Sequence, residues 1–288
     1  TAPHSAAEVG VFTFPALAFA ILRAAAAADG RQEPRLLTGP EADALIRSIL
    51  AAEDFSWPEG LSEALHTYAF TQQLRDLILR CGERGVTERD LARLGREHDR
   101  PEWIAAARFY DRYITTLALQ SAAGPLYDSA EIVRAAAAAV RERPDLAPRP
   151  EWVFVDDLQD ATPAHLELLE LLAGGGRRLI AAACPDEAVF GYQGGDPEAV
   201  RFAASYGAGE PVIRLANTHT VALAPLAATV TLSKRLRGPD RDRRRGTDTD
   251  TEGSAAVVHL PSPTREAVHI ADTLRRAHLL EGTPYAEM

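Results

Sequence analysis

The sequence predicts an α/β protein with a parallel sheet and an inserted, all-helical region. Strands are expected at residues 9–13, 152–155 and 179–183, and the second and third of these are continuous apolar runs of the kind found in buried strands. Helical patterns separate these segments, and parallel strands require such crossover connections. Residues from about 61 to 140 carry helical periodicity almost throughout, and we place the helical insertion at about 46 to 130. We therefore expect the three segments to be neighbouring strands of one sheet.

Local signals set the expected helix ends in order along the chain. The first segment ends at Thr13, and an apolar helix follows it. Thr38 and Glu41 have the spacing of a capping box and begin a helix that continues to residue 52. Turn residues at Gly85, Thr87, 99–101 and 124–125 divide the helical region into separate helices.

The apolar run at residues 152–155 leads directly into Asp156 and Asp157, and Gln159 and Asp160 follow. The carboxyl end of a strand in an open α/β sheet is where ligand chemistry is found. Two carboxylates there can hold a hydrated Mg²⁺ against phosphates and orient a water for attack. The simpler interpretation is an exposed acidic turn after a core strand.

An amphipathic helix with Pro163 in its first turn follows and is closed by glycines from Gly174. The third strand then leads into residues 184–196, which read Cys-Pro-Asp-Glu-Ala-Val-Phe-Gly-Tyr-Gln-Gly-Gly-Asp. The block 156–160 resembles the Walker B motif of superfamily 1 DNA helicases of the UvrD/Rep/RecB kind. Residues 184–196 resemble motif III of that family. Their order, their spacing and a strand before each make the resemblance specific.

Further segments agree with this family. Residues 11–23 look like its motif Ib region, residues 215–220 look like motif IV, and residues 266–276 resemble a helix of the second motor domain. The amino-acid sequence of residues 35–41 and 74–80 is most similar to that of the actinobacterial AdnA/AdnB helicase–nuclease subunits.

The resemblance implies a RecA-like parallel-sheet motor domain of the P-loop NTPase type, with an inserted all-helical subdomain and the start of a second motor domain. Residues 1–45 would be part of motor domain 1A. Residues 46–130 would be the helical insertion, similar to domain 1B. Residues 131–213 would return to domain 1A, and residues 214–288 would begin motor domain 2A.

The same resemblance implies ATP and Mg²⁺ as cofactors. Asp156 would bind Mg²⁺, and Asp157 stands where the family has the glutamate that orients the attacking water. Gln159 and Asp160 would couple the strand to motif III, although Asp160 could instead cap the following helix. The full set of implied roles is catalysis by Asp157 and Glu187, cofactor binding by Asp156, Gln159 and His219, and DNA binding by Thr13, Phe14, Tyr192 and Gln193.

Several of these positions depart from the family pattern. Glu187 replaces a glutamine that senses the γ-phosphate, and an anion there would repel phosphate. His219 replaces an arginine that reaches the γ-phosphate, and its charge is partial near neutral pH. Gln193 also replaces an arginine, whereas Tyr192 retains a ring on which a base can stack. The departures are compatible with slow hydrolysis.

No Gly-x-x-x-x-Gly-Lys-Ser/Thr loop occurs in the 288 residues. We expect the chain to be an internal fragment of a longer ATP-dependent 3′–5′ DNA helicase or translocase of DNA repair, recombination and double-strand-break end processing, and to be inactive by itself. The alternatives are a degenerate motor-like subunit that binds DNA or a helicase partner, and a short protein that lost the loop. An unrelated Mg²⁺-dependent phosphohydrolase is a more distant alternative.

Composition limits the partners. The net charge of −10 disfavours stand-alone DNA binding, because phosphate neutralisation supplies much of that affinity. The expected partners are nonetheless single-stranded or duplex DNA, together with a second helicase–nuclease subunit.

Cys81 and Cys184 are the only cysteines, which indicates a reducing cytoplasm without a disulfide framework. No segment predicts a signal peptide or membrane span. Residues 235–252 are expected to form a charged, solvated loop.

Overall fold

The computed structural model describes residues 10–120, 124–174, 178–196, 198–206, 212–235, 246–247 and 249–288. They fall into two compact units, of which the first ends at Val212 and the second begins at Ile213. The fold is mixed α/β, mostly helical, with small parallel sheets. Within the described ranges, none of the helices has the length and apolar character needed to span a bilayer.

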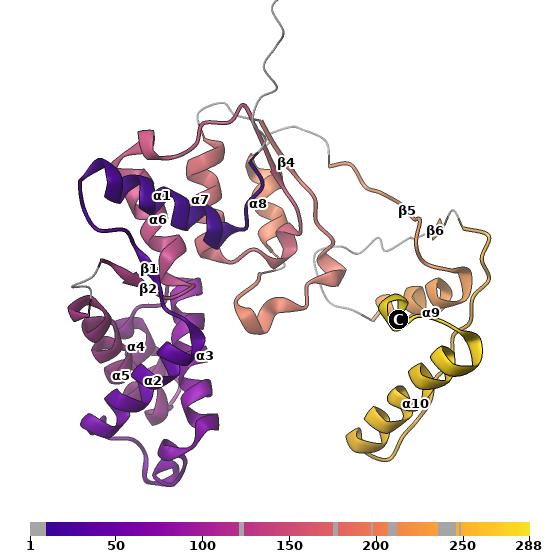
Figure 1. Cartoon of the computed structure of the whole chain (residues 1–288), viewed down its shortest axis with the longest axis horizontal. Helices are drawn as coiled ribbons and strands as arrows, with labels where there is room; N and C mark the ends of the chain where they lie inside the picture. The colour runs from indigo at the N-terminus through magenta and orange to yellow at the C-terminus, as the bar shows by residue number, and fades with distance from the viewer. Residues whose placement is uncertain are drawn as a thin grey trace, which may run out of the picture. The chain divides into compact units, whose positions relative to one another are not determined.

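A helical region occupies one part of the first unit (Figure 1). It comprises α2 (Gly39–Ala52), α3 (Tyr68–Arg84), α4 (Glu88–Glu97) and α5 (Pro101–Leu119). These helices share one apolar core, which includes Ile46, Leu74, Ile78, Leu91 and Phe109.

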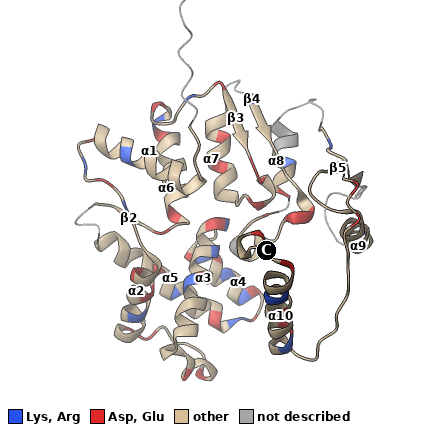
Figure 2. Ribbon diagram, turned by 45° about the vertical axis from the view of Figure 1, so that its right-hand side comes forward, with Lys and Arg blue, Asp and Glu red and all other residues tan. Residues whose placement is uncertain are grey.

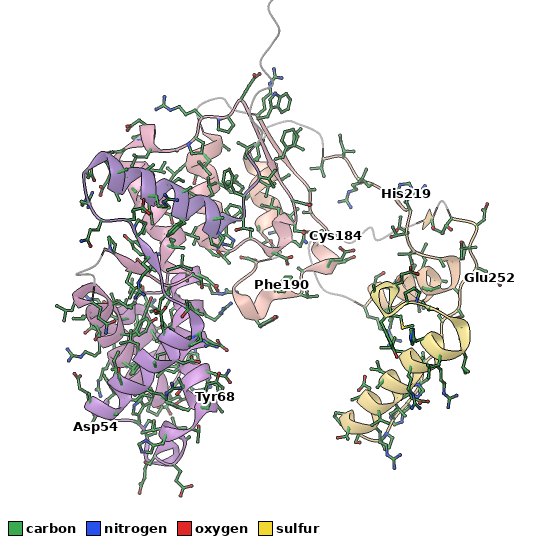
Figure 3. All side chains as sticks on the ribbon, in the orientation of Figure 1. Asp54, Tyr68, Cys184, Phe190, His219 and Glu252 are labelled. Carbon is green, nitrogen blue, oxygen red and sulfur yellow. The ribbon has the colours of Figure 1, made fainter. Side chains whose placement is uncertain are left out.

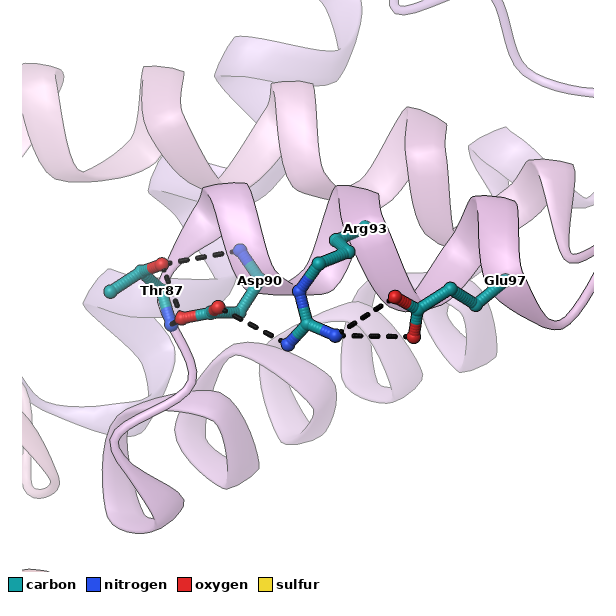
Figure 4. A network of polar contacts seen from close by, with 4 residues as sticks. All are labelled: Thr87, Asp90, Arg93 and Glu97. Atoms are coloured by element: carbon teal, nitrogen blue, oxygen red, sulfur yellow. Dashed lines mark hydrogen bonds and ion pairs between the residues drawn. The ribbon is translucent and has the colours of Figure 1, made fainter.

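The predicted ends of these helices are confirmed. The capping box between Thr38 and Glu41 begins α2, and Gly85 ends α3 in the left-handed conformation with φ of 67°. Thr87 begins α4 with a second capping box to Asp90, and Arg93 then bridges Asp90 and Glu97 (Figure 4). These contacts join residues three or four positions apart, so the local sequence is sufficient to specify them.

Two short strands beside the helical region were not predicted. β1 (Arg35–Leu36) pairs in parallel with β2 (Leu126–Tyr127), so that Arg35 lies opposite Leu126. Their two residues each are too few to show a strand period in the sequence. The expectation that residues 46–130 are entirely helical is therefore wrong at β2.

A layer of three helices forms a second core in the first unit. These helices are α1 (Phe14–Ala28), α6 (Glu131–Glu142) and α7 (Pro163–Ala173), and they lie side by side in Figure 1. Their contact is made by small and branched side chains, among them Ala18, Ile21, Ile132, Ala136 and Leu168. The predicted helix that begins at Pro163 and closes at Gly174 is confirmed.

β3 (Trp152–Val155) and β4 (Arg178–Ala181) form a parallel pair, as predicted, with Trp152 opposite Arg178. Val153 and Leu179 point to one face of this pair, which packs against α7 and α8 (Ala199–Tyr206). β4 ends two residues before the predicted limit of 183. The pair holds the carboxyl end of β3 beside the carboxyl end of β4.

The strand predicted at residues 9–13 is wrong for the described residues 10–13. Val11 and Phe12 are exposed and pair with no described strand. Thr13 is the N-cap of α1, and its Oγ1 accepts a hydrogen bond from Ala16 N at 3.3 Å. Val9 lies outside the described residues.

The second unit contains β5 (Asn217–Thr218), α9 (Leu223–Ser233), β6 (Gly246–Thr247) and α10 (Pro263–Glu281). β5 and β6 are parallel. The helix predicted at residues 266–276 is confirmed as part of α10. Of the charged loop predicted at residues 235–252, residues 236–245 and 248 lie outside the described residues, and Gly246–Thr247 form β6. Within the described ranges the strands pair only two by two, so the expected sheet of three neighbouring strands is not formed.

Candidate functional site

An acidic turn, residues 156–160, follows directly on β3 (Figure 2). Asp156 and Asp157 are both exposed. Asp157 has left-handed backbone angles, φ of 50° and ψ of 42°, which are uncommon for a residue other than glycine. Its N–H donates to Asp156 Oδ1 at 3.0 Å. The turn therefore leaves the Asp156 carboxylate at the carboxyl end of the strand, where solvent reaches it.

Gln159 connects this turn to the segment that follows β4. Its side chain is only 2% exposed. Its Nε2 donates to Asp157 Oδ1 at 3.0 Å and, more weakly, to Asp160 Oδ2 at 3.5 Å. Its Oε1 accepts from Cys184 N at 2.9 Å. Gln159 thus links the acidic turn to Cys184 through hydrogen bonds.

Backbone hydrogen bonds hold the same two segments together. Leu158 N donates to Ala182 O at 3.0 Å, and Ala182 N donates to Val155 O at 2.8 Å. Asp196 N donates to Ala161 O at 3.1 Å. Residues 184–196, which we call the 184–196 loop, are therefore attached at their start to the acidic turn, through Gln159, and at their end to Ala161, the residue that follows that turn.

The 184–196 loop carries aromatic side chains into solvent. Figure 3 shows Cys184 and Phe190 on this loop, between β4 and α8. Tyr192 lies in a short 3₁₀ turn, Phe190–Gln193, and is 70% exposed. The Phe190 and Tyr192 rings lie 6.3 Å apart at a tilt of 42°. Glu187 is exposed in an earlier 3₁₀ turn of the loop, and the side chain of Gln193 lies outside the described residues.

Asp160 does not cap the helix that follows it, so that interpretation is wrong. The N-cap of α7 is Thr162, whose Oγ1 accepts from His165 N at 3.3 Å. Asp160 is half-buried instead, and among the described residues its Oδ1 has no hydrogen-bond partner. Burial, followed by repulsion from Asp157, raises the pKa of Asp160, while the Gln159 amide lowers it.

The two proposed DNA-binding residues at the start of α1 are partly engaged in other contacts. The Thr13 hydroxyl caps α1. The Phe14 ring is half-buried and stacks face to face on His165, with ring centres 4.4 Å apart and an interplanar angle of 5°. One face of Phe14 is therefore unavailable to a base.

His165 is a feature that sequence reasoning missed. Its Nδ1 accepts from Thr162 N at 3.3 Å, which completes the capping of α7. Burial lowers the pKa of His165 to about 4, so the ring is neutral at pH 7. Its place three positions after Thr162 was the available signal, but histidine is not the usual residue there.

A cavity of about 260 Å³ lies beside the starts of α1, α6 and α7, next to the acidic turn. Glu83 from α3, Asp160, His165 and Phe190 are among the residues that line it. Nothing in the sequence near Glu83 indicated that α3 would meet the 184–196 loop. This approach depends on how distant segments pack.

The described residues contain no group of three His, Cys, Asp or Glu side chains arranged to hold a metal. Mg²⁺, however, is commonly held by one or two carboxylates together with substrate phosphates and waters. Asp156, exposed at the end of β3, fits that mode of binding. His219 is exposed just after β5 and belongs to the second unit, whereas the acidic turn belongs to the first.

Comparison with known proteins gives one family. The family model for the UvrD/REP helicase N-terminal domain matches residues 2–205. The matched range includes α1, the helical region, the acidic turn and the 184–196 loop. No curated protein matches the chain.

Proposed function

The chain belongs to the UvrD/REP family of superfamily 1 helicases, and on this basis we propose that it is part of an ATP-dependent DNA motor. In that motor the acidic turn would contact Mg²⁺–ATP. The 184–196 loop would bind single-stranded DNA, and its bases would stack on Tyr192. Helicases of this family use ATP with Mg²⁺ and act on DNA.

The observation that carries the proposal is the buried side chain of Gln159. Its Nε2 donates a hydrogen bond to the Asp157 carboxylate, and its Oε1 accepts one from Cys184 N. Because the side chain is almost fully buried, it has no water to replace a lost partner. A shift of Asp157 towards a nucleotide would therefore move the start of the 184–196 loop.

The nucleotide roles follow the placement of each carboxylate. When bound, Mg²⁺ would neutralise charge on the phosphates, and Asp156 would supply a protein ligand to it. Asp157 would orient the attacking water. Its side chain is one methylene shorter than the glutamate of the family, and such a misplacement lowers the rate.

Binding to a fluorescent single-stranded oligonucleotide tests the DNA side. Loss of base stacking costs about 1–3 kcal/mol by alanine substitution, so Tyr192→Ala should raise Kd by at least about fivefold. Tyr192→Phe should bind as the unmodified chain does. Tyr68→Ala is the matched control, because Tyr68 is also exposed (58%) but lies on the helical region (Figure 3). Equal effects of the two alanine variants, or no binding at all, would contradict the proposal.

Phosphate release tests the nucleotide side. The 288 residues contain no Gly-x-x-x-x-Gly-Lys-Ser/Thr loop to cradle the triphosphate. The purified chain should therefore not hydrolyse ATP, with or without single-stranded DNA. Sustained DNA-stimulated turnover would show that the acidic turn works with other phosphate ligands.

A second candidate function is a degenerate motor-like subunit that binds DNA or a helicase partner with little hydrolysis. Gln159 favours it, because its amide already occupies Asp157 Oδ1. In a longer form that carries a phosphate-binding loop, Asp157→Glu with Glu187→Gln should restore water positioning and remove repulsion of the phosphate. A tenfold faster turnover, about 1.4 kcal/mol of barrier, would indicate a weakened motor. Unchanged turnover with intact DNA binding would favour the degenerate subunit.

The finer assignment that we propose is an AdnA/AdnB-like cytoplasmic subunit, which pairs with a second helicase–nuclease subunit and moves 3′–5′ while processing DNA ends. This assignment is supported by the amino-acid sequence of residues 35–41 and 74–80. Co-purification of a second helicase subunit with the tagged chain from its own cells would test this pairing. Recovery of the chain alone, under conditions that preserve such complexes, would contradict it.

A further inference from the structure

Glu83, near the end of α3, packs against the 184–196 loop. Its side chain is only 17% exposed. A Cβ atom at Gly194 would lie 2.5 Å from Glu83 Oε2 and 3.2 Å from Glu83 Cβ. The side chain of Glu83 therefore occupies the space beside the Gly194 α-carbon, and no other residue type fits at Gly194 without displacing it.

The turn at Gly194 directly follows the 3₁₀ turn that carries Tyr192. Gly194 is left-handed, with φ of 86°, and its N–H donates to Gly191 O at 3.2 Å. Gly195 N donates to Phe190 O at 3.1 Å, and a Cβ atom at Gly195 would lie 3.2 Å from Asp160 O. The end of this turn is thus enclosed by Glu83 on one side and by the acidic turn on the other.

Glu83 is itself held in place from α3. Arg80 Nη1 lies 2.8 Å from Glu83 Oε2, although the two atoms are not aligned as a hydrogen bond. Burial raises the pKa of Glu83, and Arg80 opposes that effect. Burying the Glu83 carboxylate in contact with the 184–196 loop therefore costs free energy.

We propose that Glu83 is a positioning residue: by packing against Gly194, it fixes the orientation of the turn that presents Tyr192 to single-stranded DNA. The helical region would thereby help to shape the DNA-binding loop of the motor. The role of Tyr192 rests on the proposed function, whereas the contact between Glu83 and Gly194 is tested without DNA.

Two variants of Glu83 separate its reach from its charge. Glu83→Asp keeps the charge beside Arg80 but withdraws the carboxylate by about 1.5 Å. Glu83→Gln keeps the reach and removes the charge. Hydrogen-exchange mass spectrometry of residues 190–196 should show exchange at least tenfold faster in Glu83→Asp and within threefold of the unmodified chain in Glu83→Gln. The reverse order, or equal exchange in the two variants, would overturn the proposal, since Glu83 would then act only through Arg80 or not at all.

A double-variant cycle tests the contact from the other side. Gly194→Ala introduces a Cβ against Glu83 and strains a left-handed backbone, so exchange of residues 190–196 should rise. Adding Glu83→Asp should then produce no further rise, because the contact is already lost. Additive effects would overturn the proposal. If Gly194→Ala does not fold, as judged by tryptophan fluorescence, the two Glu83 variants decide the question alone.

Oligonucleotide binding distinguishes this inference from the proposed function. Glu83→Asp should raise Kd by at least threefold, and Glu83→Gln should change it by less than twofold. If the unmodified chain binds no single-stranded DNA, the proposed function fails while the exchange data still decide the role of Glu83. If DNA binds normally to Glu83→Asp despite faster exchange, the positioning role is overturned and the proposed function is unaffected.

Discussion

Mild acid should destabilise the first unit through one side chain, His165. Burial lowers the pKa of His165 from 6.5 to about 4. Its Nδ1 accepts a hydrogen bond from Thr162 N at the start of α7, and its ring stacks on Phe14. A proton on Nδ1 would remove that acceptor and would place a positive charge at the positive end of a helix.

The size and sign follow from the two pKa values. The unfolded chain takes up a proton on this histidine near pH 6.5, whereas the folded chain resists until about pH 4. The stabilising contribution is therefore complete above pH 6.5 and is lost as the pH falls towards 4. The whole loss is about 3 kcal/mol of unfolding free energy, of which about 2 kcal/mol falls between pH 7 and pH 5.

Urea unfolding followed by tryptophan fluorescence measures this loss, because Trp57, Trp103 and Trp152 all lie in the first unit. Series at pH 7, 6 and 5 should be compared for the unmodified chain and for His165→Gln. Glutamine at this position can still complete the capping box but does not titrate. The variant should lose about 2 kcal/mol less than the unmodified chain between pH 7 and pH 5.

His66→Gln is the control, because His66 is exposed in the helical region. Its pH profile should follow that of the unmodified chain. The reasoning is refuted if His165→Gln and the unmodified chain lose stability in parallel, or if the His165 ring titrates near pH 6.5 in the folded chain by NMR.

Three further predictions concern stability and use the same unfolding assay at pH 7. Thr87→Ala removes the cap of α4 and should lower the unfolding free energy by about 1 kcal/mol; no change would mean that the capping box in Figure 4 contributes nothing. Asp43→Ala leaves Arg75 without its buried partner at 2.7 Å and should cost about 3 kcal/mol, whereas a cost below 1 kcal/mol would indicate that water replaces the carboxylate. Gln159→Ala should cost about 1–3 kcal/mol and accelerate amide exchange at Cys184, whose N–H loses its acceptor. Unaltered exchange there would refute the proposed link between the acidic turn and the 184–196 loop.

The sequence alone was sufficient where the deciding contacts are local. The starts of α2 and α4 depend on Thr38 and Thr87 and on an acidic residue three positions later, so they can be read from the chain. The apolar run of β3 and the carboxylates after it were equally visible. The family resemblance then added roles for these carboxylates that no single residue would have indicated.

Tertiary structure alone decided the contacts between distant segments. A strand was also expected at residues 9–13, where Thr13 caps a helix instead. Neither the stacking of Phe14 on His165 nor the packing of Glu83 against Gly194 leaves a local pattern in the sequence. Such contacts depend on which surfaces meet when the cores close, because burial is governed by the packing of whole elements rather than by neighbours along the chain.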